Sequence, residues 1–351
     1  MFLILICQAL AVNAFAQSRA VDHSGLNNGL EVEDLASPSN MLVEYFSTKQ
    51  EKSNKLAFLR SRKLITNGGL LKYFLMVPHT DPVNVMPVVN TRPIFWGASW
   101  NNPKFYSDKI FGLMHWYENF QDSTYASTVS EYLPSKLHHS FFGIMIDSSP
   151  ANSDPEMVLN KICELAGGTI NSKSDYYPVY TDIKRGNASY CAYHSAGTCG
   201  GRPIQFAFFF DIDDDPDCDP QSPYAPPAKT IYSQKPGMIV GMNSNYQQSQ
   251  GLAALVNVSS HELVEVITDP GYFPPNGNPY WGGWFDIFGA ENADKCAWTF
   301  GPSNTGLSPG TVSVGAFDWK LQGTWSNSAQ ITGEGGYPTQ RGVLVGCVTG
   351  S

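Results

Sequence analysis

Residues 261–270 read His-Glu-Leu-Val-Glu-Val-Ile-Thr-Asp-Pro, and the fold of the second half of the chain is interpreted from this string. A helix turns by about 100° per residue and would place one imidazole and three carboxylates on one face: His261, Glu262, Glu265 and Asp269. No Lys or Arg occurs between residues 236 and 294. Carboxylates crowded in this way need a cation, a shared proton or bulk water. We expect a bound divalent metal ion.

The string also differs by one residue from the His-Glu-x-x-His helix of zinc proteases. In that pattern residues i and i+4 face the metal, and the Glu beside the first ligand activates water. Zinc accepts a glutamate oxygen as a ligand. The sequence therefore predicts His261 and Glu265 as ligands of Zn²⁺ and Glu262 as the catalytic base. The alternative is a solvated polar face on an amphipathic helix, which usually interleaves basic residues with its acids.

Two other segments offer further ligands. Residues 284–296 place three carboxylates among aromatic side chains, and we expect Asp286 and Glu291 to bind or support the metal. Acidic residues that cap turns are the alternative there. His194, close to a predicted strand and loop, could supply a second imidazole, or it could be a hydrogen-bonded structural histidine.

Residues 211–219 alternate acidic side chains in the manner of a calcium loop. Pro216 stands where the helix-loop-helix calcium motif needs Gly, and Ser222 stands where it needs Glu. A generic extracellular Ca²⁺ site and a solvated turn both remain open. The chain has no Gly-x-Ser-x-Gly elbow and no P-loop, so serine hydrolase and nucleotide-binding classes find no support.

Composition and the N-terminus indicate an exported globular protein. The chain has 351 residues, of which 42% are hydrophobic and 15% charged, and its net charge of −9 disfavours nucleic acid and anionic membranes as partners. Residues 1–16 are apolar and end in Ala14-Phe15-Ala16, which predicts a signal peptide cleaved before Gln17. That run is too short to span a bilayer, and no later segment has 18 consecutive apolar residues. We expect a secreted protein.

Cysteine and asparagine patterns agree with an oxidising compartment. Without the leader six cysteines remain, which predicts three disulfides: Cys163, Cys191, Cys199, Cys218, Cys296 and Cys347. Cys191 and Cys199 could close a short loop, but six cysteines allow 15 pairings and the sequence leaves them open. Of the two glycosylation sequons, Asn187 is favoured, because Asn257 falls inside a predicted helix.

Hydrophobic periodicity places strands at residues 88–97, 140–146, 177–183, 204–212 and 238–242, and helices at 56–76, 104–133, 154–166 and 248–268. The run 140–146 is expected at the centre of a sheet. This order predicts an α/β (or α+β) fold: a mixed central sheet with flanking helices, a metallopeptidase-like helix and a loop-rich β C-terminal part. We expect a partly ordered N-terminal extension at residues 17–84 and one domain at 85–351.

Several short segments occur in a fixed order: 94–97 (Ile-Phe-Trp-Gly), 193–195 (Tyr-His-Ser), 260–265, 268–270, 283–286 (Gly-Trp-Phe-Asp), Glu291 with Asp294 and Cys296, and 325–327 (Trp-Ser-Asn). This order resembles a group of secreted proteins that are distantly similar to the exordium (phosphate-induced protein 1) family. The resemblance covers residues 85 to 330, and its specific part is 260–296. It implies an extracellular or wall-associated protein with a metallopeptidase-like site, acting on a peptide or cell-wall substrate. The alternative is a non-catalytic protein with a structural ion.

Overall fold

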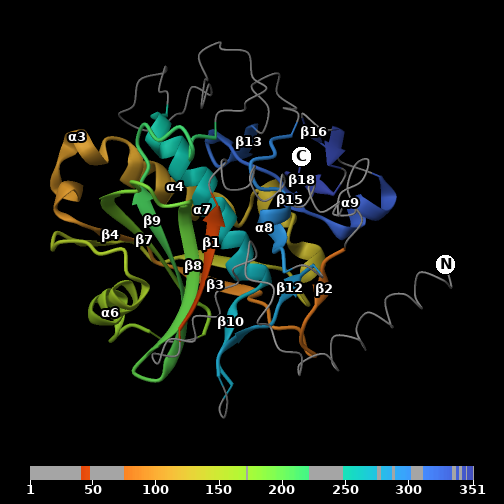
Figure 1. Cartoon of the computed structure of the whole chain (residues 1–351), viewed down its shortest axis with the longest axis horizontal. Helices are drawn as coiled ribbons and strands as arrows, with labels where there is room; N and C mark the ends of the chain where they lie inside the picture. The colour runs from red at the N-terminus through yellow and green to blue at the C-terminus, as the bar shows by residue number, and fades with distance from the viewer. Residues whose placement is uncertain are drawn as a thin grey trace. The chain divides into compact units, whose positions relative to one another are not determined.

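A mixed eight-stranded sheet forms the centre of the computed structural model (Figure 1). Its strands are β1 (Leu42–Ser47), β3 (Val88–Thr91), β4 (Ile94–Trp96), β5 (His138–Phe141), β6 (Met145–Asp147), β7 (Asp175–Lys184), β8 (Tyr190–Cys199) and β9 (Arg202–Asp211). The order is β1-β8-β9-β7-β3-β5, and β4 pairs with β6 and β7. Strands β3, β4, β5, β6, β7 and β9 pair in parallel, whereas β8 runs antiparallel to β9 and β1. The predicted α/β class with a mixed central sheet is confirmed.

Helices cover both faces of this sheet. On β8, Gly197 faces α6 (Pro155–Ala166), where an added Cβ would lie only 2.6 Å from a methyl carbon of Leu159. On the same strand His194 faces α7 (Gln250–Thr268). Because side chains alternate along a strand, residues 194 and 197 point to opposite faces. Helices α6 and α7 therefore lie on opposite sides of the sheet (Figure 1).

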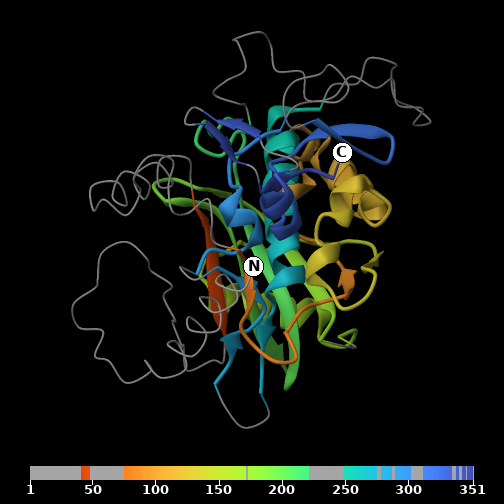
Figure 2. The same ribbon diagram turned by 90° about the vertical axis from the view of Figure 1, so that its right-hand side faces the viewer.

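Helix α7 is buried along its length. It begins at Ser249, whose hydroxyl accepts a hydrogen bond from the N–H of Leu252, and it ends before Asp269 and Pro270. Every residue from Gly251 to Thr268 is buried. The sheet, α4 (Lys109–Phe120) and the C-terminal segments pack around it (Figure 2). The helix predicted at 248–268 is confirmed, and its acidic face does not point into solvent.

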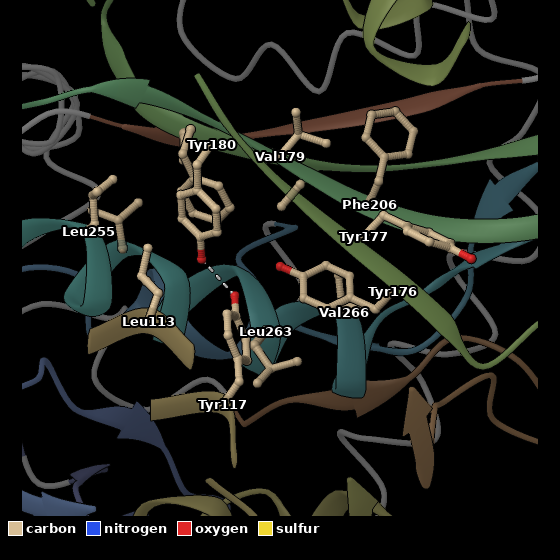
Figure 3. Packing of buried hydrophobic residues seen from close by; sticks show 14 of the residues in the cluster. Leu113, Tyr117, Tyr176, Tyr177, Val179, Tyr180, Phe206, Leu255, Leu263 and Val266 are labelled. Atoms are coloured by element: carbon tan, nitrogen blue, oxygen red, sulfur yellow. Dashed lines mark hydrogen bonds between the residues drawn. The ribbon is translucent and has the colours of Figure 1, made fainter. Parts of the chain in front are cut away.

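The shared core of α4, α7 and the sheet is rich in tyrosine (Figure 3). The hydroxyl groups of Tyr117 and Tyr180 lie 2.8 Å apart, and Tyr180 also lies 2.8 Å from the hydroxyl of Ser259 on α7. Buried hydroxyl groups are costly without partners, so these bonds fix how α4 and α7 sit on β7.

The part of the chain after α7 consists of short elements, as predicted. Its strands are β10 (Gly271–Tyr272), β11 (Tyr280–Trp281), β12 (Trp284–Phe285), β13 (Thr311–Val314), β14 (Phe317–Lys320), β15 (Thr324–Trp325), β16 (Tyr337–Thr339), β17 (Gly342–Leu344) and β18 (Cys347–Val348). Its helices are α8 (Asn292–Lys295) and α9 (Asn327–Thr332). Helix α8 and strand β14 pack directly against α7.

Three disulfides join the six cysteines of the described residues: Cys163–Cys199, Cys191–Cys218 and Cys296–Cys347. The number predicted from composition is confirmed. The short loop between Cys191 and Cys199 is not closed by a disulfide, because both residues lie on β8 and each is bonded to a different segment.

Three predicted elements differ from the structure, and two of them are divided into shorter ones. The strand at 88–97 is split into β3 and β4 around Pro93, which has no N–H to donate. The helix at 104–133 is divided into α3 (Pro103–Tyr106), α4, α5 (Thr124–Ser127) and the short turn η3 (Ser130–Tyr132), since Ser107 has a positive φ of 42° after α3 and Ser123 caps the start of α5. A further turn, η2 (Ala98–Asn101), precedes α3.

The run 140–146 does not form a central strand, so that prediction is wrong. It contributes to β5, which ends the strand order, and to β6, which pairs with β4. Phe142 and Ile146 are 54% and 49% exposed, so the apolar run does not reflect burial on both faces of the sheet.

The structure describes residues 41–47, 75–170, 173–220, 248–274, 278–286, 289–301, 311–333, 337–339, 342–344 and 346–350. The predicted signal peptide, the helix at 56–76 and the strand at 238–242 lie outside these residues, apart from the last two positions of that helix. Within the proposed N-terminal extension, β1 pairs with β8 and β2 (Val77–Pro78) pairs with β12. Segments before residue 85 therefore pack as part of the domain. Among the described helices, none combines the length and apolar character needed to cross a bilayer.

Candidate metal centre

Residues from four places in the chain meet at the C-terminal half of α7. Strand β8 supplies His194, α7 supplies His261, Glu262 and Glu265, the end of α7 supplies Asp269, and the start of α8 supplies Glu291 and Asp294. All of these side chains are buried except that of Asp294, which is 23% exposed. The expectation that the carboxylates of α7 point inward, toward His194 and Glu291, agrees with this arrangement.

His194 is held in the middle of a long paired strand, where it lies opposite Ala207 of β9. Its Nδ1 atom lies 3.2 Å from Oε2 of Glu262 and 3.5 Å from Oε2 of Glu265. Its Nε2 atom lies 3.8 Å from Oε1 of Glu291. The ring of Trp281 packs edge-on against the imidazole at 4.9 Å between centroids.

His261 faces a second set of acids. Its Nε2 atom lies 3.0 Å from Oε2 of Glu265, one helical turn away, and 3.7 Å from Oδ1 of Asp294. The same oxygen of Glu265 is therefore approached by both imidazoles. On the other side of the ring, Nδ1 of His261 lies 2.7 Å from Nε2 of Gln322.

The surrounding backbone holds these acids in place. The N–H of Asp294 donates to Oε1 of Glu265 at 3.0 Å, so α8 is attached directly to α7. The N–H of Gly283 donates to Oδ1 of Asp269 at 2.6 Å. A Cβ at position 283 would lie 2.1 Å from the carbonyl oxygen of Thr268, so only glycine allows this approach to the end of α7.

Burial and charge shift the pKa values of the imidazoles in the ion-free protein. Burial opposes a positive charge on His194, but hydrogen bonds and charges from Glu262 and Glu265 outweigh it and raise the pKa to about 10. The pKa of His261 is also raised, because burial is outweighed by Glu265, Glu262 and Asp294.

The carboxylates divide into two groups by their pKa. Burial raises the pKa of Glu262 to about 7 and that of Asp269 to about 6. Burial acts in the same direction on Glu265, but the two imidazoles overcome it and lower its pKa to about 2. Without an ion, the site thus balances its negative charge by holding protons.

Nε2 of His194 and Oε1 of Glu262 are buried and have no hydrogen-bond partner among the described residues. A buried polar atom without a partner costs about 1–3 kcal/mol. Oε1 of Glu262 has lone pairs, and Nε2 of His194 gains one when the imidazole gives up its proton to a binding cation, which fits an ion-binding site better than a closed hydrogen-bond network.

The donor atoms fit a divalent metal ion. Two groups of three residues bring one ligand atom each within 4.8 Å of one another: His194, Glu265 and Glu291, and His261, Glu265 and Asp294. Imidazole nitrogen together with carboxylate oxygen is typical of Zn²⁺ and similar transition metals. Ca²⁺ takes oxygen ligands, so the imidazoles disfavour it here.

Four of the predicted ligands, His194, His261, Glu265 and Glu291, belong to these groups, and Glu262 lies beside His194. Asp286 does not belong to them: it pairs with Lys295 at 2.7 Å and accepts a hydrogen bond from the N–H of Ala290.

Asp294, Asp269 and Gln322 were not predicted as site residues. Asp294 lies three residues after Glu291, a spacing that places both side chains on one side of a helical turn and could have revealed it. Asp269 was placed on the acidic face of α7 but given no role. Gln322 lies in a segment with no distinguishing pattern.

The acidic segment 211–219 forms ion pairs within the protein. Asp211 pairs with Lys184, Asp213 with Lys109, and Asp215 with Arg185. The segment is therefore a turn of ion-paired acids rather than the solvated turn expected as the alternative to a Ca²⁺ site, and neither of the two candidate metal groups includes these residues.

The two sequons differ in accessibility. Asn187 is exposed in the turn between β7 and β8. Asn257 is buried in α7, and its side-chain oxygen accepts a hydrogen bond from the N–H of Gln322. The preference for Asn187 therefore agrees with the structure.

Comparisons with protein-family models, with curated proteins and with solved structures found no match to this chain, so its function is inferred from the site itself.

Proposed function

We propose that this chain is a secreted, metal-dependent hydrolase of the peptidase-like class. The observation that supports this most directly is the convergence of two imidazoles and five carboxylates in the interior. Glu262 and Glu265 have imidazoles as charged partners, and Lys295, which follows Asp294 in sequence, pairs with Asp286. A buried cluster with this much negative charge is stabilised by a cation.

Glu265 belongs to both candidate ligand groups and is the residue most directly implicated in holding the ion. His194 with Glu291, or His261 with Asp294, would complete the coordination. A bound divalent ion would polarise a carbonyl group and lower the pKa of water toward neutrality.

Glu262 is suited to take a proton from water. Its Oε2 atom is held by Nδ1 of His194, while its Oε1 atom has no hydrogen-bond partner among the described residues. In the ion-free protein its pKa is about 7, and a general base works best when its pKa is close to the operating pH. His194 would then both orient this carboxylate and stabilise its charge.

The partly exposed side chain of Asp294 marks the side from which a substrate could approach. We infer a peptide or another extracellular polymer as the substrate class. Export agrees with the three disulfides, which persist in oxidising compartments.

The deep burial of the other site residues favours a second candidate function. Structural metal sites are closed, whereas catalytic ones keep a position open for water or substrate. A non-catalytic extracellular protein with a structural ion would fit the complete burial of His194, His261 and Glu262.

Metal analysis of the purified protein combined with Glu262→Gln separates these functions. Both proteins are assayed for zinc content and for cleavage of a mixed peptide library followed by mass spectrometry. A hydrolase should keep its metal in the variant and lose roughly 10²- to 10⁴-fold in rate. Glu118→Gln, on the exposed face of α4, is the matched control. Equal cleavage by the variant, or wild-type protein without metal, would overturn the proposal.

A further inference from the structure

We propose that this centre holds two divalent ions bridged by Glu265, one on the side of His194 and Glu291 and the other on the side of His261 and Asp294. This inference rests on the proposed function only in treating the cluster as a metal site. It does not depend on hydrolysis.

The first argument is the way the donors are divided. Each candidate group contains one imidazole and one terminal carboxylate, and the groups share only Glu265. Its Oε2 atom lies 3.5 Å from Nδ1 of His194 and 3.0 Å from Nε2 of His261. A carboxylate between two such sets is the arrangement of two-metal sites, in which the ions lie about 3.5–4 Å apart.

The second argument is charge. The cluster contains five carboxyl groups: Glu262, Glu265, Asp269, Glu291 and Asp294. One divalent ion brings two positive charges to these five groups, whereas two ions bring four, so a second ion compensates more of the negative charge that the fold gathers here.

The third argument is the pair of buried atoms without a hydrogen-bond partner among the described residues. Nε2 of His194 lies on the side of Glu291, at 3.8 Å from its Oε1 atom, and Oε1 of Glu262 belongs to the carboxylate that contacts the same imidazole. Nε2 of His194 provides the His194 side with a ligand atom that is separate from the contacts of His261, and Oε1 of Glu262 remains open to a water molecule beside it.

Gln322 makes the two positions unequal. Its Oε1 atom accepts a hydrogen bond from the N–H of Trp298, and its Nε2 atom donates one to the carbonyl of Ala293. These two bonds fix the orientation of the amide, so that its Nε2 atom faces Nδ1 of His261. A histidine that binds metal through Nε2 carries its proton on Nδ1 and needs an acceptor there. The amide of Gln322 must therefore reverse before His261 binds an ion, and the ion at His194 binds first.

The test is a zinc titration of the ion-free full-length protein, followed by metal analysis after gel filtration. We expect two ions per chain, with affinities that differ by about tenfold or more. Mn²⁺ in place of Zn²⁺ should give the electron paramagnetic resonance signal of an exchange-coupled pair. His194→Gln and His261→Gln should each keep one ion, and Asp286→Asn, the matched buried control, should keep both.

A count of one ion in the wild type, or loss of all metal in both histidine variants, would overturn the two-ion assignment while leaving a one-ion hydrolase intact. Two ions without any hydrolysis would leave the assignment intact and reject the enzyme. No bound ion rejects both proposals. Gln322→Glu supplies an acceptor to Nδ1 of His261 and should tighten the weaker site, and unchanged affinity there would overturn the order of binding.

Discussion

In the ion-free protein, raising the pH from 6.5 to 9 should destabilise the fold because His194 loses its proton more easily when unfolded. Its pKa is about 10 in the folded protein and 6.5 in the unfolded chain, since Glu262 and Glu265 outweigh the effect of burial. A group with a raised folded pKa contributes its full stability below the unfolded pKa and loses it as the pH rises through the folded value. The free energy of unfolding should therefore fall over this range.

The magnitude follows from about 1.36 kcal/mol per pH unit for one proton. Over 2.5 pH units the loss is about 3 kcal/mol, a large part of the 5–15 kcal/mol that typically stabilises a domain. Burial raises the pKa of Glu262 to about 7, so this group also makes the protein less stable as the pH rises, but most of its contribution to stability is lost between pH 4.5 and 7. His139, whose pKa burial lowers to about 4, affects the stability only below pH 6.5.

Urea unfolding in the presence of a chelator, followed by tryptophan fluorescence at several pH values, measures this slope. His194→Gln should remove the part of the slope that belongs to His194, whereas the raised pKa of His261 leaves a smaller slope of the same sign. Saturating zinc should flatten or reverse it, because metal ligands must be deprotonated and binding then tightens with pH. If the stability of the ion-free protein stays level or increases from pH 6.5 to 9, Glu262 and Glu265 do not raise the pKa of His194, and the reasoning is refuted.

Three other changes test separate parts of the structure. Cys347→Ser removes the bond to Cys296, which lies next to α8, and should cost about 2–5 kcal/mol in thermal unfolding together with a measurable loss of metal affinity. Asp286→Asn should lower the melting temperature, because it leaves the buried Lys295 without its acidic partner. The same variant should keep its full metal content, and a loss of metal would show that Asp286 is a ligand, as predicted from the sequence. Asn187→Gln should lower the mass of protein expressed through a eukaryotic secretory pathway by one glycan, whereas an unchanged mass would show that this exposed sequon is not used.

The parts of the fold that were predictable are those where local pattern and tertiary packing agree. Asp154 caps α6 and Gly167 ends it, as expected from residue types that satisfy or terminate a helix. Strands β7 and β9 carry continuous apolar runs because both of their faces are covered. Phe142 and Ile146 carry a similar run but lie at the edge of the sheet, so hydrophobicity alone could not place them.

The candidate site was predictable where it follows one helix. His261, Glu262 and Glu265 share a face of α7, and helical periodicity brings them together. His194 stood out only as another histidine in this half of the chain, since β8 itself was not predicted. The role of Gln322 depends on contacts with Trp298 and Ala293, which are set by the tertiary fold and leave no local pattern.

The enclosure of α7 would also determine how fast a bound ion leaves. An ion bound beside His194 would lie next to the segment that carries Glu291 and Asp294, so its escape would require that segment to open first. The Cys296–Cys347 bond tethers this segment to β18 and makes such openings rarer. We therefore expect a chelator to strip the oxidised protein slowly and the reduced protein quickly, so that the thiol state of the surroundings controls the residence time of the metal.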